Sequence, residues 1–99
     1  MKVAIIGAGN MGGAIALGMA KGTIVAANEI FVADPSQANL DKLKQQVPEM
    51  NIAASNAEAV KDADIVILAV KPWLVNVVLE AITLNNNQID ISHLSSGNY

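Results

Sequence analysis

The chain has 99 residues and forms one domain at most. Hydrophobic residues make up 53% of it, above the usual share of about 45–50%, and this excess indicates apolar surface for a partner outside the chain. Nine acidic against six basic residues give a net charge of −3 without a basic cluster, so we expect no nucleic-acid partner. The absence of cysteine excludes a disulfide scaffold, a thiolate metal site and a cysteine nucleophile, and His93 alone cannot form a metal cluster, so we expect no metal ion.

The first expected strand and helix share one short stretch of the chain. Lys2–Ile6 is a continuous apolar run that ends at Gly7, as expected for a strand buried on both faces. The next segment repeats its apolar residues at a helical spacing and should end near Lys21, with Gly22 as C-cap. The residues of that expected buried stripe are Met11, Ala14, Ile15, Gly18 and Met19.

Two further strand and helix pairs follow. Glu29–Ala33 is the second expected strand, and a helix from about Pro35 to Val47 comes after it. Asn51–Ala54 fits a short third strand. Ser55 and Glu58 have the spacing of a capping box, which indicates the start of the next helix.

The strongest strand pattern lies in the second half of the chain, at Asp64–Val70. Its apolar core is far too short to span a bilayer, and no signal peptide precedes the first strand, so we expect a cytoplasmic protein without a membrane partner. Pro72 suits the first turn of a helix. Ile89 and Ile91 alternate with polar residues, which fits an edge strand. The expected buried face of the helix after Pro72 carries Leu74, Val77, Val78, Ala81 and Ile82.

A glycine motif joins the first strand to its helix: Gly7–Gly12 reads G-x-G-x-x-G. Gly7 would permit the tight turn, Gly9 would let the backbone approach a pyrophosphate, and Gly12 would let helix and strand pack closely. The amides of the helix start would point at the anion. A turn chosen for packing alone is the lesser alternative. With the alternating strands and helices, the motif predicts an α/β fold of the Rossmann type, a parallel sheet of about five strands in the order 3-2-1-4-5 with helices on both faces.

Asp34 follows the second strand, 22 positions after Gly12. NAD-binding domains carry there an acid that binds the ribose 2′-hydroxyl. The same residue also fits an N-cap, with Pro35 at the first helical position. Facing the ribose, Asp34 would repel a 2′-phosphate, whereas the amides of Ser36 and Gln37 at a helix start could receive one. The choice between NAD and NADP stays open at this point.

Lys71 follows the strongest strand, at the edge where doubly wound sheets bind ligands. Pro72 restricts Lys71 to an extended backbone, which would leave its ammonium free for a phosphate or a substrate carboxylate. A solvated lysine is the alternative, and position alone favours it. Asn56 fits an ordinary first-turn residue, and we expect Trp73 to pack rather than to stack on a ligand.

Two segments, GAGNMGGAI at 7–15 and ADIVILAVKP at 63–72, closely resemble the cofactor domain of pyrroline-5-carboxylate reductases, in that family's order and spacing. Enzymes of the family reduce a cyclic imine to proline by hydride transfer, usually with NADPH. The resemblance implies that residues 1–99 are a dinucleotide-binding domain and that the helical domain for substrate and dimerisation lies outside this chain. We therefore expect the chain alone to lack activity, and the full-length enzyme to bind a small imine and to be a homo-oligomer.

The same resemblance implies roles for individual residues. Gly9, Asn10 and Met11 would hold the pyrophosphate, and Asp34 to Ser36 would meet the adenosine ribose or its phosphate. Asn56 matches an asparagine of the family that contacts the cofactor. The nicotinamide side would be lined by Ala69, Val70, Lys71 and Pro72.

Two features limit what the resemblance implies. Asp90–Gly97 aligns poorly with the family, and no site residue is assigned there. No residue is a convincing proton donor, so the catalytic acid is unassigned. The alternatives are another two-domain oxidoreductase, of the β-hydroxyacid or deazaflavin-linked type, and a nucleotide-sensing module without chemistry. Lys71 and Pro72 favour the imine reductase over them.

Overall fold

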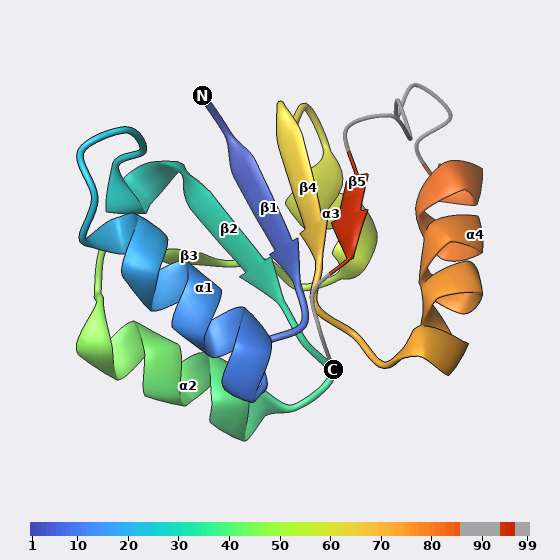
Figure 1. The fold of residues 1–99 in the computed structure, drawn as a ribbon, viewed down its shortest axis with the longest axis horizontal. Coiled ribbons are helices and arrows are strands. Elements are labelled where there is room, and N and C mark those ends of the chain that lie inside the picture. The colour runs from blue at the N-terminus through green and yellow to red at the C-terminus, as the bar shows by residue number, and fades with distance from the viewer. Residues whose placement is uncertain (86–93, 97–99) are drawn as a thin grey trace.

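A parallel sheet lies between two layers of helices in the computed structural model, which describes residues 1–85 and 94–96 (Figure 1). The strand order is β3-β2-β1-β4-β5, and every pair is parallel, so the predicted α/β fold and its strand order are confirmed. Four strands form the body of the sheet, and a short β5 lies at its edge. The expected edge strand around Ile89 and Ile91 falls outside the described residues. The strands are β1 (Val3–Ile6), β2 (Ile30–Ala33), β3 (Asn51–Ile52), β4 (Ile65–Leu68) and β5 (Leu94–Ser96).

The central strand, β1, is buried on both faces, as predicted from its unbroken apolar run. Val3 and Ile5 pack into one hydrophobic cluster, whereas Ala4 and Ile6 pack into the other. All four residues are buried because β1 has β2 on one side, β4 on the other and a helical layer over each face. This strand therefore contributes side chains to both hydrophobic cores.

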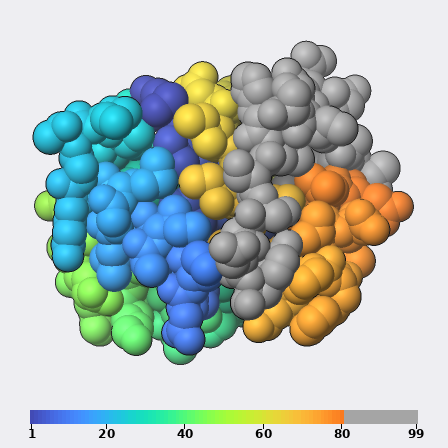
Figure 2. Space-filling view, viewed as in Figure 1, coloured from blue at the N-terminus to red at the C-terminus, as the bar shows by residue number. Residues whose placement is uncertain are grey.

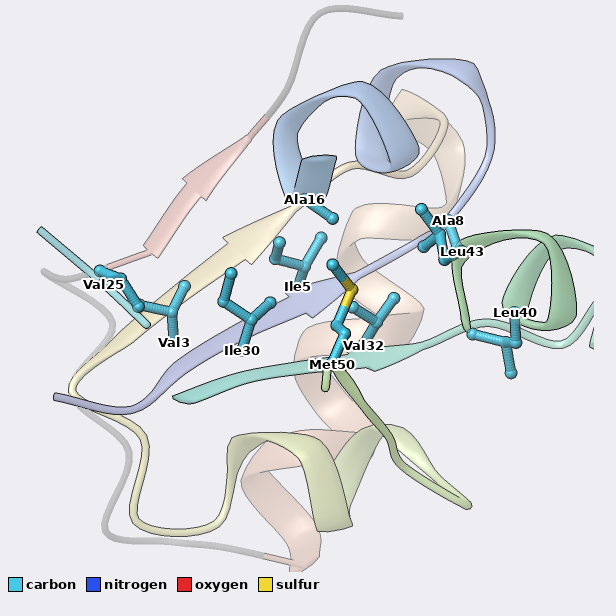
Figure 3. Packing of buried hydrophobic residues seen from close by; sticks show 10 residues of the cluster. All are labelled: Val3, Ile5, Ala8, Ala16, Val25, Ile30, Val32, Leu40, Leu43 and Met50. Carbon is cyan, nitrogen blue, oxygen red and sulfur yellow. The ribbon is translucent and has the colours of Figure 1, made fainter. Parts of the chain in front are cut away.

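Helices α1 (Asn10–Ala20) and α2 (Gln37–Gln46) cover the face of the sheet turned toward the viewer in Figure 1. Their side chains and those of the sheet form the first core, which Figure 3 shows from close by. Val25 and Met50 close this core from the connecting segments. Its buried members are Val3, Ile5, Ala8, Ala16, Val25, Ile30, Val32, Leu40, Leu43 and Met50.

The buried face of α1 differs from the predicted stripe. Gly12, Gly13 and Ala16 are buried, whereas Met11, Ala14 and Gly18 of the predicted stripe are exposed. The prediction failed because this helix is apolar nearly all round, so periodicity does not select a face, and packing against the sheet instead selects the smallest residues. The predicted end was also one residue late. The helix ends at Ala20 with Lys21 as C-cap, and the Gly22 amide donates to the Met19 carbonyl oxygen at 3.0 Å.

Helices α3 (Asn56–Val60) and α4 (Val75–Asn85) cover the other face, and two short 3-10 turns, η1 (Ala27–Glu29) and η2 (Pro72–Leu74), join helices to strands. From α4, Val75, Val78 and Leu79 pack against the second core. The buried members of that core are Ala4, Ile6, Ala33, Ala53, Ala59, Val60, Val66 and Leu68.

The segment of η2 and the first turns of α4, orange at the right of Figure 2, exposes three large apolar side chains. Trp73 is 73% exposed, Val77 61% and Leu74 41%, so the predicted burial of Leu74 and Val77 and the predicted packing of Trp73 are wrong. The side chains of Ala81 and Ile82 lie outside the described residues. Exposed apolar side chains of the kind that the composition predicted are therefore present on η2 and α4.

Candidate functional site

A cleft with a volume of about 770 Å³ opens at the carboxyl ends of β1, β2 and β4, the edge toward which their arrows point in Figure 1. Here the chain leaves β1 toward β2 on one side, whereas β4 lies on the other side, and such a switch point is where open α/β sheets bind ligands. The lining residues are Ile6, Gly7, Gly9, Asn10, Met11, Ala14, Ala33, Asp34, Pro35, Asn56, Ala69, Val70, Lys71, Leu74 and Val78.

Most of the predicted site residues meet in this cleft. Gly12, Ser36 and Pro72 are the predicted residues that do not line it. Those that do are Gly7, Gly9, Asn10, Met11, Asp34, Asn56, Ala69, Val70 and Lys71. Sequence reasoning missed most of the apolar walls, although their places beside the glycine motif, at the end of β2 and in the helical segment after Pro72 could have indicated them. These missed residues are Ile6, Ala14, Ala33, Leu74 and Val78.

Gly7 and Gly12 shape the turn between β1 and α1. Gly7 has a φ of +106°, and a Cβ on it would lie 2.4 Å from the Ala69 carbonyl oxygen. A Cβ on Gly12 would lie only 1.8 Å from the Gly7 carbonyl oxygen. Both predicted roles, the tight turn and the close packing of helix and strand, are therefore confirmed.

Gly9 occupies a different environment at the start of α1. It is exposed, and a Cβ placed on it would have no heavy atom within 4 Å. Gly9 is the N-cap of α1 and offers no side chain to the first amides of the helix, which have no partner within a helix. The end of α1 next to the cleft can therefore receive an anion on its backbone amides.

Asp34 connects the glycine turn to the corner between β2 and α2. Its Oδ2 accepts a hydrogen bond from the Ala8 amide and its Oδ1 one from the Ser36 amide, each at 2.6 Å. The interpretation of Asp34 as the N-cap of α2 is wrong. The N-cap is Ser36, whose Oγ accepts a hydrogen bond from the Asn39 amide at 3.4 Å. The bond from Asp34 to the amide two residues on forms a turn that moves the helix start to Gln37.

Ser36→Ala tests this assignment of the cap. We expect the substitution to lower the free energy of unfolding by about 1 kcal/mol, because it removes the side-chain acceptor at the start of α2. Urea denaturation followed by circular dichroism would measure the change. Ser55→Ala at the N-cap of α3, where Oγ accepts from the Glu58 amide at 3.1 Å, is a matched comparison with a similar expected loss. An unchanged stability of Ser36→Ala would contradict the assignment of Ser36 as the cap.

Lys71 and Asn56 come to the cleft from the β4 side of the sheet. Lys71 has the extended backbone predicted from Pro72, with φ −62° and ψ 149°. Its side chain is exposed and also lines the cleft, so Lys71 is both solvated and accessible to a ligand, and the two interpretations do not exclude each other. Asn56 is the first residue of α3 and is half-buried. It also lines the cleft, where a ligand could contact it, which an ordinary first-turn residue would not do.

The charges of the cleft are few. Among the described residues that line it, Asp34 is the one anion and Lys71 the one cation. Within residues 1–85 and 94–96, no three acidic or histidine side chains gather as metal ligands would. None of the helices in these ranges has the length and apolarity needed to cross a membrane.

Comparison with known proteins gives a consistent set of relatives. Pyrroline-5-carboxylate reductase of Pseudomonas aeruginosa is 37% identical over 81 residues, which are 82% of this chain and 29% of that protein. The Coxiella burnetii pyrroline-5-carboxylate reductase superimposes with a TM-score of 0.80 at 29% identity, over 96% of this chain and 34% of the other. Pyrroline carboxylate reductase of Plasmodium falciparum, solved with NADP bound, gives a TM-score of 0.74 at 29% identity, over 97% of this chain and 32% of the other.

The chain thus spans about a third of the length of these relatives and corresponds to their amino-terminal domain. The resemblance to pyrroline-5-carboxylate reductases is confirmed for that domain. Residues 2–96 also match the model of a protein family described as NADP oxidoreductase, coenzyme F420-dependent. That match covers nearly the whole chain, and the chain therefore belongs to this oxidoreductase family.

Proposed function

We propose that residues 1–99 are the nicotinamide-dinucleotide-binding domain of a pyrroline-5-carboxylate reductase. The observation that carries the proposal is the open start of α1 at Gly9, set beside a cleft at the switch point of the sheet. The named relatives support the reaction, the reduction of a cyclic imine to proline. When bound, the dinucleotide supplies the hydride, and the chain's own residues bind and orient it.

The residues of the cleft divide into three parts in this proposal. The first-turn amides from Gly9 to Met11 hold the pyrophosphate. Asp34 faces the adenosine ribose on the β2 side. Asn56, Ala69, Val70 and Lys71 border the nicotinamide on the β4 side, and Pro72 follows them outside the lining of the cleft. The apolar side chains of Val70 and Leu74 exclude water from the ring.

A second candidate is a deazaflavin-linked oxidoreductase, because the description of the family names coenzyme F420. The three relatives compared above favour the imine reductase, because each of them is a pyrroline-5-carboxylate reductase. Calorimetric titration with NADH, NADPH and a reduced deazaflavin separates the two. Binding of the deazaflavin in addition to NADPH would favour the second candidate, because the family description names both cofactors.

The proposed partners extend beyond the described residues. The imine substrate would bind in the full-length enzyme, where a second domain meets the cofactor domain, and that enzyme would be a cytoplasmic homo-oligomer without nucleic-acid or membrane partners. The exposed apolar side chains of Trp73 and Val77, beside the cleft, support an additional partner surface. A chain of residues 1–99 alone would then hold the cofactor but only part of the substrate site.

Cofactor binding and activity of the 99-residue chain test whether it holds the cofactor site without the complete substrate site. We expect one dinucleotide to bind per chain in calorimetric titration, and we expect negligible reduction of pyrroline-5-carboxylate in an assay of NADPH absorbance. Measurable turnover would show that the substrate site lies within these residues. Failure to bind NADH and NADPH would overturn the proposed cofactor site itself.

A further inference from the structure

The glycine turn between β1 and α1 lies between the ends of two other strands. On the β2 side it is held by a hydrogen bond, in which the Ala8 amide donates to Asp34 Oδ2 at 2.6 Å. On the β4 side it meets Ala69, whose own amide donates to the Ile6 carbonyl oxygen at 2.8 Å. That bond continues the pairing of β1 with β4 by one residue, so the backbone of Ala69 is fixed beside the turn.

The contact between the turn and Ala69 is one of close packing. A Cβ on Gly7 would lie 2.4 Å from the Ala69 carbonyl oxygen, and a Cβ on Gly12 would lie 3.2 Å from the Ala69 Cβ. The backbone of the turn therefore lies against both the carbonyl group and the methyl group of Ala69. Protein interiors are packed so densely that even one added methylene is felt. A larger side chain at position 69 would have to push Gly12 away or extend into the cleft that Ala69 lines.

A displacement of this turn would reach the start of α1. Gly9 is the N-cap of α1 and Gly12 lies in its first turn, so a push on Gly12 also moves the amides from Gly9 to Met11. An N–H···O hydrogen bond requires a distance of about 2.7–3.2 Å between donor and acceptor. These amides can therefore hold an anion only within a narrow range of positions, and the neighbour that limits the position of the turn on the β4 side is Ala69.

We infer that Ala69 is a positioning residue for the pyrophosphate, because the small size of its side chain sets where the glycine turn and the first amides of α1 lie. The inference rests on the proposed function, since it takes those amides as the pyrophosphate site. It gives Ala69 a role beyond bordering the nicotinamide, and it couples the two parts of the cleft through one side chain. A residue that only borders the nicotinamide would not affect a ligand that lacks this ring.

ADP separates the two roles, because it contains the adenosine and the pyrophosphate but no nicotinamide. We expect Ala69→Val to weaken the binding of both NADH and ADP at least tenfold in calorimetric titration, because the turn is displaced. Leu74→Ala, in the wall beside the nicotinamide, should weaken NADH binding and leave the ADP affinity within twofold. Ala54→Val is the matched control, because it adds the same two methyl groups at an exposed alanine outside the cleft, and both affinities should stay within twofold.

The ligand-free chain offers an independent measurement of the same effect. In nitrogen-15 NMR spectra, the backbone amide signals of Gly9 and Asn10 should shift in Ala69→Val and stay in place in Ala54→Val. Circular dichroism would show whether each variant is folded. If Ala69→Val does not fold, Ala69→Ser adds one atom instead of two carbons, and it should weaken both ligands about threefold or more.

Three results would overturn the inference. An ADP affinity that remains unchanged in Ala69→Val, or in Ala69→Ser in its place, would limit Ala69 to the nicotinamide side. A similar loss of ADP affinity in Leu74→Ala would show that the effect is not specific to the glycine turn. Unshifted amide signals of Gly9 and Asn10 would show that the turn does not move. Binding of neither NADH nor ADP by the unaltered chain would instead overturn the proposed function, and the pyrophosphate role of Ala69 with it, whereas the amide signals report on the turn in either case.

Discussion

Gly12→Ala is expected to unfold the domain or to lower its free energy of unfolding by about 3 kcal/mol or more. The added methyl group would lie 1.8 Å from the Gly7 carbonyl oxygen and 3.2 Å from the Ala69 Cβ. Neither neighbour is the end of a flexible side chain, so relief requires α1 to move away from β1. That movement would open the glycine turn and the first core together.

Gly13→Ala is the matched control for this effect, one residue along the same helix. Its methyl group would lie 3.5 Å from the Ala8 carbonyl oxygen and 3.9 Å from Leu43 Cδ2, which are ordinary contacts. Alanine favours a helix over glycine by up to about 1 kcal/mol, so this variant should be as stable as the unaltered chain or more so. Thermal and urea unfolding would measure both variants. Equal stability of the two would show that the approach of α1 to β1 is less tight than described.

Gly9→Ala is expected to retain the fold and to weaken dinucleotide binding at least tenfold, about 1.4 kcal/mol. The φ of Gly9 is −73°, which alanine adopts readily, and the new methyl group meets no protein atom within 4 Å. That empty space is where the proposed pyrophosphate approaches the backbone. A loss of affinity without a loss of stability would therefore report on the ligand alone.

Gly18→Ala provides the comparison for Gly9→Ala, because a Cβ there also meets nothing within 4 Å, near the other end of α1. We expect its affinity for NADH and NADPH to equal that of the unaltered chain. Titrations of the three proteins, with circular dichroism as a check on folding, would decide the matter. Equal dissociation constants for Gly9→Ala and the unaltered chain would refute the phosphate role of the glycine turn.

The sequence was sufficient for the strand order and for most of the cleft because the rules that govern them act on short segments. A buried strand followed by glycines fixes the turn at Gly7 and Gly12, and the order of alternating strands and helices fixes the sheet. Lys71 could be placed because Pro72 restricts the residue before it. The residues of the cleft then follow from the rule that the carboxyl ends of parallel strands share one edge.

The features that could not be predicted depend on contacts between distant segments. The buried face of α1 was missed because both of its sides are apolar and only the distance to the sheet distinguishes Gly13 from Met11. The bond from Ala8 to Asp34 joins two loops, and no local pattern signals it. Exposure of Trp73 was missed because a large apolar side chain is expected to pack, and no local pattern shows that η2 leaves this residue on the surface.

The place of β1 at the centre of the sheet has a consequence for how the protein forms on the ribosome. Val3 pairs with Ile30 on one edge and with Ile65 on the other, so β1 emerges first but its second partner emerges much later. Until then one edge of an entirely apolar strand is unpaired, which is a template for aggregation. Pairing between such distant segments is slow, so the yield of refolded protein should fall as the protein concentration rises during refolding.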